Sequence, residues 1–264
     1  MSSSSPDAGP AGVETTEVIS FLDELLDVAS FEDYGPNGLQ VPGVDRVGLV
    51  ATGVSGQLEL FERAAALGAQ LVLVHHGILW DGHPRRISSE QAARLKALLS
   101  AGINLAAYHL PLDAHPELGN NALLANRLGG QELSPFGMHR RRPIGVRARF
   151  GGDGLTPREL IERVSKLTGR EPLLLGAGPE RVRSIGIVSG AGADSLPEAV
   201  ALGLDAFLTG EPREHVMADA REAGIHFVAA GHYATETLGI RRLGEIVAER
   251  FAIRHAFIDI PNPV

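Results

Sequence analysis

The feature that most constrains the fold is residues 71–77, where the apolar run Leu-Val-Leu-Val leads directly into His75, His76 and Gly77. A short apolar run of this kind is typical of a strand that is buried on both faces of a parallel sheet. Ligand sites of open α/β sheets lie just beyond the carboxyl ends of such strands. Adjacent strand residues point to opposite faces, so both histidines serve one site only if the backbone turns there, which Gly77 permits.

Apolar runs and helical patterns alternate around this strand. Strands are predicted at 47–52, 71–74 and 103–108, with helices at 57–67 and 88–101 between them. This βαβαβ order predicts a parallel sheet. Ser88 is expected to cap the second helix. An earlier helix is predicted from a cap at Thr15 or Thr16 to about Ser30.

A second alternation follows a stretch, 131–180, in which the pattern weakens. Its expected strands are 183–188, 206–208 and 226–230. One helix is expected to begin near 196, a second to end near 224, and a third to span 234–250. A last strand-like segment is 252–260. We therefore predict an α/β fold of two parallel or mixed-sheet lobes, with the functional site at strand carboxyl ends. The predicted division is a disordered tail at 1–13, a site-bearing lobe at 14–130 plus about 231–264, and a second lobe at about 131–230.

Composition narrows the functional classes. The formal net charge of −8 argues against nucleic-acid binding, which needs an electropositive face. With no cysteine there is no disulfide and no thiolate ligand, so any metal must be held by nitrogen and oxygen atoms. The Ser-, Pro- and Gly-rich start lacks the pattern of a secretion signal, and no apolar run approaches the roughly 20 residues that span a bilayer. These features fit a cytoplasmic protein with no membrane segment.

Ligand-type side chains gather just past three of the predicted parallel strands. They supply three imidazoles and two carboxylates: His75, His76, Asp113, His232 and Glu236. Glu236 lies one helical turn from His232 if that histidine begins a helix. Such a set suits two divalent ions about 3.5–4 Å apart, with one carboxylate bridging them. Zn, Fe, Mn, Co and Ni all accept these donors.

Four other features are each weighed between a structural role and a functional role. Segment 33–43 is predicted to be an ordered loop around a Pro-Asn-Gly turn. The SGAGAD turn at 189–194 either cradles a phosphate or is simply a tight turn, and the turn is favoured because the phosphate-loop spacings are missing. The basic run at 139–142 is favoured as a solvated face over a phosphate clamp. Trp80 is favoured as a packing residue.

Five segments together resemble one known family. They are DYGPNGLQVPG (33–43), VHHGILWDG (74–82), HLPLDAHPELGNNALLA (109–125), the glycine turn before LDAFLTGEP (204–212), and AGHYATE (230–236). Over about residues 17–260 the chain resembles the NGG-interacting-factor-three-like family, also called GTP cyclohydrolase I type-two homologues, and its short bacterial type. The resemblance implies a cytoplasmic dinuclear-metal protein of two α/β lobes, assembled as a toroidal homohexamer. It also implies that the five residues above are the metal ligands, with Glu236 reaching both ions.

The residues and the resemblance together lead us to expect a metal-dependent hydrolase that acts on a small nucleotide-like substrate, such as the purine ring of GTP. Divalent ions lower the pKa of bound water from far above neutral towards about 7. His109 is expected to carry a proton or to support the site from outside the metal shell. The rival interpretation is a metal-binding or metal-delivery protein without turnover. A scaffold for protein partners is weaker, because an adaptor surface needs no cluster of five ligands.

Overall fold

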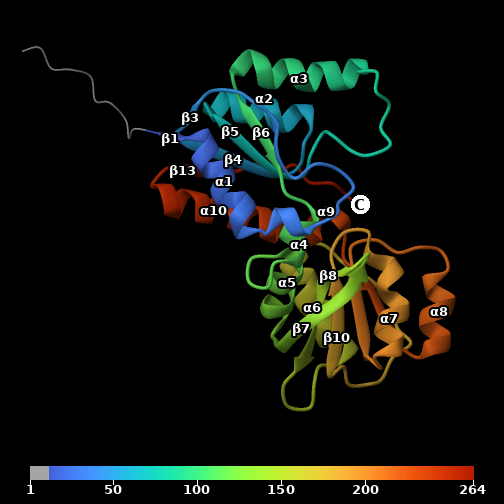
Figure 1. Ribbon diagram of the computed structural model, residues 1–264. Coiled ribbons are helices and arrows are strands. Elements are labelled where there is room, and N and C mark those ends of the chain that lie inside the picture. The colour runs from blue at the N-terminus through green and yellow to red at the C-terminus, as the bar shows by residue number, and fades with distance from the viewer. Residues whose placement is uncertain (1–11) are drawn as a thin grey trace, which may run out of the picture. The chain divides into compact units, whose positions relative to one another are not determined.

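The computed structural model describes residues 12–264 (Figure 1). Of the tail predicted at 1–13, residues 1–11 lie outside the described part of the chain. The tail does not extend to Val13, because strand β1 (Val13–Glu14) pairs antiparallel with strand β3 (Arg46–Val47). Backbone hydrogen bonding to a segment far along the chain therefore decides the structure at this point, rather than local composition.

The chain divides into two compact units that interrupt each other in sequence. Among the described residues, unit 1 contains 12–28, Tyr34–Tyr108 and Leu243–Asp259. Unit 2 contains Ala29–Asp33, His109–Arg242 and Ile260–Val264. The predicted boundaries at 130 and 231 differ from these. The physical reason is that helix α5 (Asn120–Leu128) buries its apolar side chains in a core of unit 2, so the chain changes units directly after Tyr108.

Unit 1 is built on a five-stranded sheet with the strand order β13–β4–β5–β6–β2. Its strands are β2 (Gly38–Val41), β4 (Leu49–Ser55), β5 (Leu71–His76), β6 (Asn104–Ala107) and β13 (Arg254–Phe257). Four strands are parallel, and β2 pairs antiparallel with β6 at the edge. The parallel sheet predicted from the βαβαβ order is confirmed, with β5 at its centre.

The core of unit 1 surrounds β5. All four apolar residues of that strand have no exposed surface, which is the burial expected for a strand covered on both faces. The helices of this unit are α1 (Thr15–Leu25), α2 (Leu58–Leu67), α3 (Ser89–Ala101) and the part of α10 (Thr237–Phe251) from Leu243 onward. Ser88 caps α3 as predicted, since its hydroxyl accepts a hydrogen bond from the Gln91 backbone N–H at 3.2 Å.

Two local predictions for unit 1 are wrong. Segment 33–43 is not a loop throughout, because its second half forms β2 against β6. Neither Thr15 nor Thr16 caps α1, whose N-cap residue is Glu14. The Thr15 hydroxyl instead donates a hydrogen bond to the Val44 carbonyl at 2.8 Å, so it anchors the start of the helix to a distant segment.

Unit 2 is built on a six-stranded mixed sheet with the strand order β7–β8–β10–β11–β12–β9. Its strands are β7 (Gly130–His139), β8 (Arg142–Phe150), β9 (Leu173–Leu175), β10 (Ser184–Val188), β11 (Ala206–Thr209) and β12 (His226–Ala229). The three predicted strands are confirmed as the parallel series β10–β11–β12. The neighbours outside this series pair antiparallel. The α/β class with parallel or mixed sheets is therefore confirmed for both units.

The stretch 131–180 is regular, although its pattern is weak. It contains the β7–β8 hairpin, helix α6 (Pro157–Thr168) and β9. Glycine and proline interrupt the alternation of β7, and most of that edge strand remains at least partly exposed. A sequence pattern based on burial is therefore weak there.

Two apolar clusters cover the two faces of the sheet of unit 2. Alternate strand residues enter different clusters: Ala206 and Leu208 pack with α5 and α6, whereas Phe207 packs with α7 (Leu196–Ala201) and α8 (Val216–Ala223). The remaining helical segments are α4 (Leu110–Ala114), α9 (His232–Thr235), the first residues of α10, and the 3₁₀ turns η1 (Val28–Ser30) and η2 (Gly192–Ser195). Apolar packing on both faces of the sheet thus fixes the strand ends that carry the side chains just beyond them.

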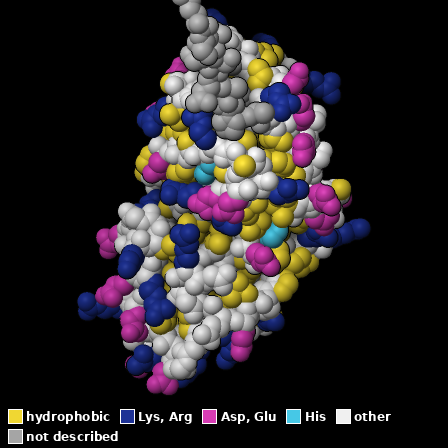
Figure 2. All heavy atoms as spheres, turned by 90° about the vertical axis from the view of Figure 1, so that its left-hand side faces the viewer, with side chains coloured by type: hydrophobic (Ala, Val, Ile, Leu, Met, Phe, Trp, Pro, Cys, Tyr) yellow, Lys and Arg dark blue, Asp and Glu magenta, His cyan; other side chains and the backbone are white. Residues whose placement is uncertain are grey.

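Charged groups of both signs lie interspersed on the face drawn in Figure 2. This distribution accords with the negative formal charge of the chain and offers no broad electropositive surface on that face. Among residues 12–264, no helix combines the length and the apolar character that crossing a membrane would require.

Candidate metal centre

The paired histidines lie at the carboxyl end of the central strand of unit 1. Strand β5 runs through His76, so the predicted strand end at residue 74 is too early. His75 is fully buried and His76 is partly exposed. The two imidazole rings are 4.7 Å apart between centroids, and each offers a ring nitrogen within 4.8 Å of one from the other. The pair can therefore act together without a turn between the two residues.

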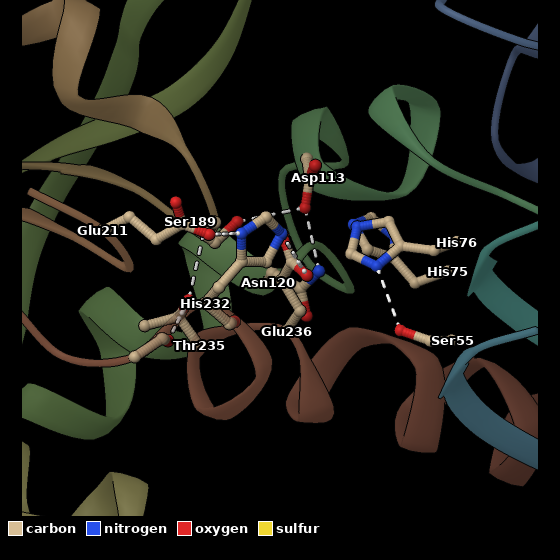
Figure 3. Close-up of polar contacts among 12 residues, drawn as sticks. Ser55, His75, His76, Asp113, Asn120, Ser189, Glu211, His232, Thr235 and Glu236 are labelled. Carbon is tan, nitrogen blue, oxygen red and sulfur yellow. Dashed lines mark hydrogen bonds and ion pairs between the residues drawn. The ribbon is translucent and has the colours of Figure 1, made fainter. Parts of the chain in front are cut away.

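Hydrogen bonds orient both imidazoles, and Figure 3 shows the one between His76 and Ser55. His75 Nδ1 lies 2.9 Å from the Tyr108 carbonyl oxygen. Because a carbonyl oxygen only accepts, Nδ1 carries the hydrogen of the neutral ring, and Nε2 keeps the lone pair that a metal needs. His76 Nδ1 lies 3.3 Å from Ser55 Oγ, on the neighbouring strand β4.

The segment around β2 supports the turn that follows these histidines. Gln40 Oε1 accepts a hydrogen bond from the Ile78 backbone N–H at 2.9 Å, and Gln40 Nε2 donates to the Pro36 carbonyl at 2.8 Å. A Cβ atom on Gly77 would lie only 2.3 Å from Gln40 Nε2, so the Gln40 side chain occupies the space that a larger residue at position 77 would need. The Trp80 indole donates to the Gly77 carbonyl at 3.0 Å, in agreement with the packing role predicted for that side chain.

Unit 2 brings three of the predicted ligands together. Asp113 lies on α4, His232 begins α9 and Glu236 directly follows α9. Oxygen atoms of Asp113 and Glu236 lie within 4.8 Å of one another, and Glu236 Oε2 is 3.2 Å from His232 Nε2. Glu236 is thus the common neighbour of the other two. The helical-turn spacing predicted for residues 232 and 236 is confirmed.

Side chains that the sequence patterns did not single out hold Asp113 in place (Figure 3). Its Oδ1 accepts hydrogen bonds from Asn120 Nδ2 at 2.8 Å and from Ser189 Oγ at 3.1 Å. Asn120 Oδ1 in turn accepts from the Gly239 backbone N–H at 2.8 Å, which ties the start of α5 to α10. Only the Gly-Asn-Asn sequence at 119–121 hinted at this role, because two adjacent asparagines are uncommon inside a helix.

His232 is held between two carboxylates. Glu236 contacts Nε2, and Glu211, just beyond the carboxyl end of β11, forms a hydrogen bond with Nδ1. Burial alone would lower the pKa of His232, but hydrogen bonds and charges from Glu236 and Glu211 outweigh it and raise the pKa to about 9. In the metal-free protein the imidazole therefore carries a proton at neutral pH, and a metal ion has to displace that proton.

The SGAGAD turn is a close-packed turn and not a phosphate cradle. Its backbone N–H groups donate to side-chain oxygens of the protein: Ser189 to Asn121 at 2.6 Å, Gly190 to Thr235 at 3.1 Å, and Gly192 to Thr209 at 3.0 Å. These donors are therefore already engaged. The turn instead closes round the candidate ligands, because a Cβ atom on Gly190 would lie 2.2 Å from a carboxylate oxygen of Glu236.

His109 pairs with an aspartate of the same unit. Its Nδ1 lies 2.7 Å from Asp33 Oδ1, and the Leu110 backbone N–H donates to Asp33 Oδ2 at 2.9 Å. Asp33 therefore fixes both the ring of His109 and the first residue of α4. This geometry suits either of the two roles predicted for His109, because an oriented imidazole can transfer a proton or hold a neighbouring group.

The donors within unit 2 suit a divalent metal. Asp113 is 6% exposed and Glu236 is 2% exposed, so two almost fully buried carboxylates lie within 4.8 Å of one another. Burying two carboxylates side by side costs solvation energy, and a cation between them would offset that cost. Imidazole nitrogen and carboxylate oxygen are donors that Zn, Fe, Mn, Co and Ni accept. The chemistry of these residues therefore fits metal binding.

Comparisons with known proteins identify the family. The family model Duf34/NIF3 (NGG1p interacting factor 3) matches residues 13–263. A Pseudomonas aeruginosa protein named GTP cyclohydrolase 1 type 2 homolog is 41% identical over 251 residues, which cover 95% of this chain and 99% of that protein. An Escherichia coli K12 protein of the same name is 43% identical over 258 residues, covering 95% and 100%.

Two solved structures are similar over nearly the whole chain. A structure described as protein ybgI, of unknown function, is 42% identical with a TM-score of 0.90, and covers 96% of this chain and 100% of that one. The protein TTHA1606 from Thermus thermophilus is 35% identical with a TM-score of 0.88 at the same coverage. Because the family model and these relatives each span nearly the whole chain, the resemblance is confirmed, and the chain belongs to the Duf34/NIF3 (NGG1p interacting factor 3) family.

Proposed function

We propose that the protein binds two divalent metal ions per chain through five residues: His75, His76, Asp113, His232 and Glu236. The observation that carries this proposal is the buried pair Asp113 and Glu236 beside His232, because a divalent cation would offset the cost of burying two carboxylates so close together. The oriented pair of histidines at the end of β5 supports it from unit 1. The identity of the metal is left to experiment.

We further propose that the metal centre serves hydrolysis of a small nucleotide-like substrate. The names of the bacterial relatives, GTP cyclohydrolase 1 type 2 homolog, support this substrate class. When bound, divalent ions would supply the means to lower the pKa of water into the neutral range, and so to make it a nucleophile. The resemblance also supports a toroidal homohexamer in the cytoplasm.

The residues of the chain would divide the work as follows. Glu236 would hold both ions, since it lies next to both Asp113 and His232. Asn120 and Ser189 would keep the carboxylate of Asp113 in place through their hydrogen bonds to Oδ1. His109 would accept and return a proton at Nε2, because Asp33 holds its Nδ1.

Turnover of a nucleotide panel tests this proposal. Chelator-treated protein would be reloaded with each of Zn, Fe, Mn, Co and Ni, and incubated with GTP and other nucleotides while ring opening and phosphate release are followed. Asp113→Asn should abolish any metal-dependent turnover, whereas Asp219→Asn, an exposed aspartate on α8 of the same unit, should not. Absence of turnover with every metal would overturn the proposal that the protein is a hydrolase. If ions also passed to an acceptor protein in a parallel transfer assay, the metal-delivery interpretation would replace it.

A further inference from the structure

A recess in unit 2 is lined by the basic run at 139–142. The cavity has a volume of about 200 Å³. Its walls come from the tip of the β7–β8 hairpin, from Ser30, Phe31 and Glu32 near the start of the unit, and from Leu110 at the start of α4. The three arginines are exposed, as a solvated face would be, but they also line a concave site, which a solvated face does not require.

The lining carries excess positive charge. Three guanidinium groups share the recess with one carboxylate, Glu32, which lies 3.3 Å from Arg140. Burial and the charge of Arg140 lower the pKa of His139, and the nearby Asp33 carboxylate opposes them only in part, so this histidine contributes little positive charge at neutral pH. In a chain with a formal charge of −8, such a local excess runs against the overall balance. The recess therefore favours an anion.

The chemistry of the walls suits a phosphate group. The Arg142 guanidinium lies over the Phe31 ring, 4.8 Å from its centroid. A guanidinium stacked in this way keeps its N–H groups in its own plane, where they can donate in pairs to phosphate oxygens. The apolar side chains of Phe31, Leu110 and Ile144 complete the lining and would strengthen such bonds by excluding water.

The hairpin turn is built from residues that are poor choices for a turn. His139 pairs with Arg142, so Arg140 and Arg141 form a two-residue connection, and Arg140 has a φ of 53°. Two-residue hairpin turns favour Asn-Gly or Asp-Gly, because glycine, asparagine and aspartate tolerate positive φ. A position where local stability is sacrificed is often one where function fixes the side chain.

We infer that this recess binds the phosphate part of a phosphorylated small molecule. Its volume is below the roughly 300–1,000 Å³ of sites that enclose a whole drug-sized ligand, so it fits one or a few phosphate groups rather than a complete nucleotide. Leu110 lies on the same short helix, α4, as the candidate ligand Asp113. The assignment of these phosphates to the substrate of the metal centre rests on the proposed function, whereas the binding itself does not.

Calorimetric titration of the full chain with inorganic tripolyphosphate tests the binding. Metal would be removed first, so that metal–phosphate contacts contribute nothing. The double variant Arg141→Gln/Arg142→Gln should weaken binding by about tenfold or more, because each lost charge-assisted hydrogen bond costs about that much. A charge-matched control, Arg158→Gln/Arg221→Gln, removes two exposed arginines elsewhere in unit 2 and should change affinity by less than about twofold. Thermal melts would confirm that both variants fold.

Glu32→Gln provides a test in the opposite direction. It removes the lone carboxylate of the recess and should tighten tripolyphosphate binding several-fold. Equal weakening in the control pair, no effect of Glu32→Gln, or no binding by the wild type would each overturn the inference. If phosphate binding persists and metal-dependent turnover is absent, the proposed function fails and the phosphate site stands. If turnover occurs with the same KM for GTP in the Arg141→Gln/Arg142→Gln variant, the recess does not serve that substrate.

Discussion

Replacing Gly190 by alanine should damage the candidate metal centre, whereas the same change at Gly203 should not. The two glycines share a backbone conformation, with φ of 61° and 64°. Their surroundings differ. A Cβ atom at Gly190 would lie 2.2 Å from Glu236 Oε1 and 3.1 Å from His232 Nε2, whereas one at Gly203 would have no heavy atom within 4 Å. Gly203→Ala is therefore a matched control that contains the backbone strain without the contact.

The expected loss of folding free energy has two parts, the strain of the backbone and the steric contact of the added methyl group. An alanine held in the left-handed region costs about 1–2 kcal/mol, and this applies to both variants. Overpacking a filled site adds about 1–3 kcal/mol, and this applies only at Gly190. The turn cannot move away without breaking the hydrogen bond from the Gly190 backbone N–H to Thr235 Oγ1. Glu236 has little room to move either, because it is only 2% exposed. Gly203→Ala should thus cost about 1–2 kcal/mol and Gly190→Ala about 2–5 kcal/mol in total.

Urea unfolding and elemental analysis of the two variants and the wild type measure both effects. Gly203→Ala should keep the metal content of the wild type, whereas Gly190→Ala should lose metal, because the added methyl group displaces the Glu236 carboxylate. The reasoning is refuted if the two variants have the same free energy of unfolding and the same metal content.

Three further predictions concern the ions and the protons that compete with them. Glu236→Ala should remove more metal than replacement of any one of the three histidines, because a bridging carboxylate holds both ions; elemental analysis that finds two ions per chain in this variant would exclude bridging. In metal-stripped protein the free energy of unfolding should fall by roughly 3 kcal/mol between pH 6.5 and 9, because the folded state, with the pKa of His232 raised to about 9, retains a proton that the unfolded chain has released. Urea unfolding of His232→Gln should lack this fall, and a fall of equal size there would assign it to another group. Chelation should lower the Tm but leave a cooperative unfolding transition. Metal binding to the native state alone adds about 2.7 kcal/mol of stability at one hundred times Kd, whereas each unit has its own apolar core. An unfolded-like circular dichroism spectrum after chelation would contradict this prediction.

The elements that could be predicted from the sequence are those with a strong local pattern. The run at 71–74 has the composition of a fully buried strand, and its four residues are indeed fully buried. The alternation around it predicted the parallel order of β4, β5 and β6. The same reasoning found β10, β11 and β12, because a buried parallel strand is apolar along its whole length.

The remaining features depend on contacts between distant residues, which a local pattern does not encode. Ser189 bonds to Asp113 from 76 positions away in sequence, and Glu211 reaches His232 from 21 positions away. The division between the units was also hidden, because α5 looks like any amphipathic helix until the sheet on which it packs is known. The division places the two histidines of β5 in unit 1 and the other three candidate ligands in unit 2.

The central claim is that these five residues hold two ions per chain. Anomalous diffraction from crystals of metal-loaded protein, recorded at the absorption edge of the bound metal, tests it most directly. The account predicts two anomalous peaks per chain, with Glu236 near both, and with nitrogen and oxygen atoms of the five residues at about 2.0–2.2 Å if the metal is zinc. A single peak, or peaks whose protein ligands are other residues, would contradict it.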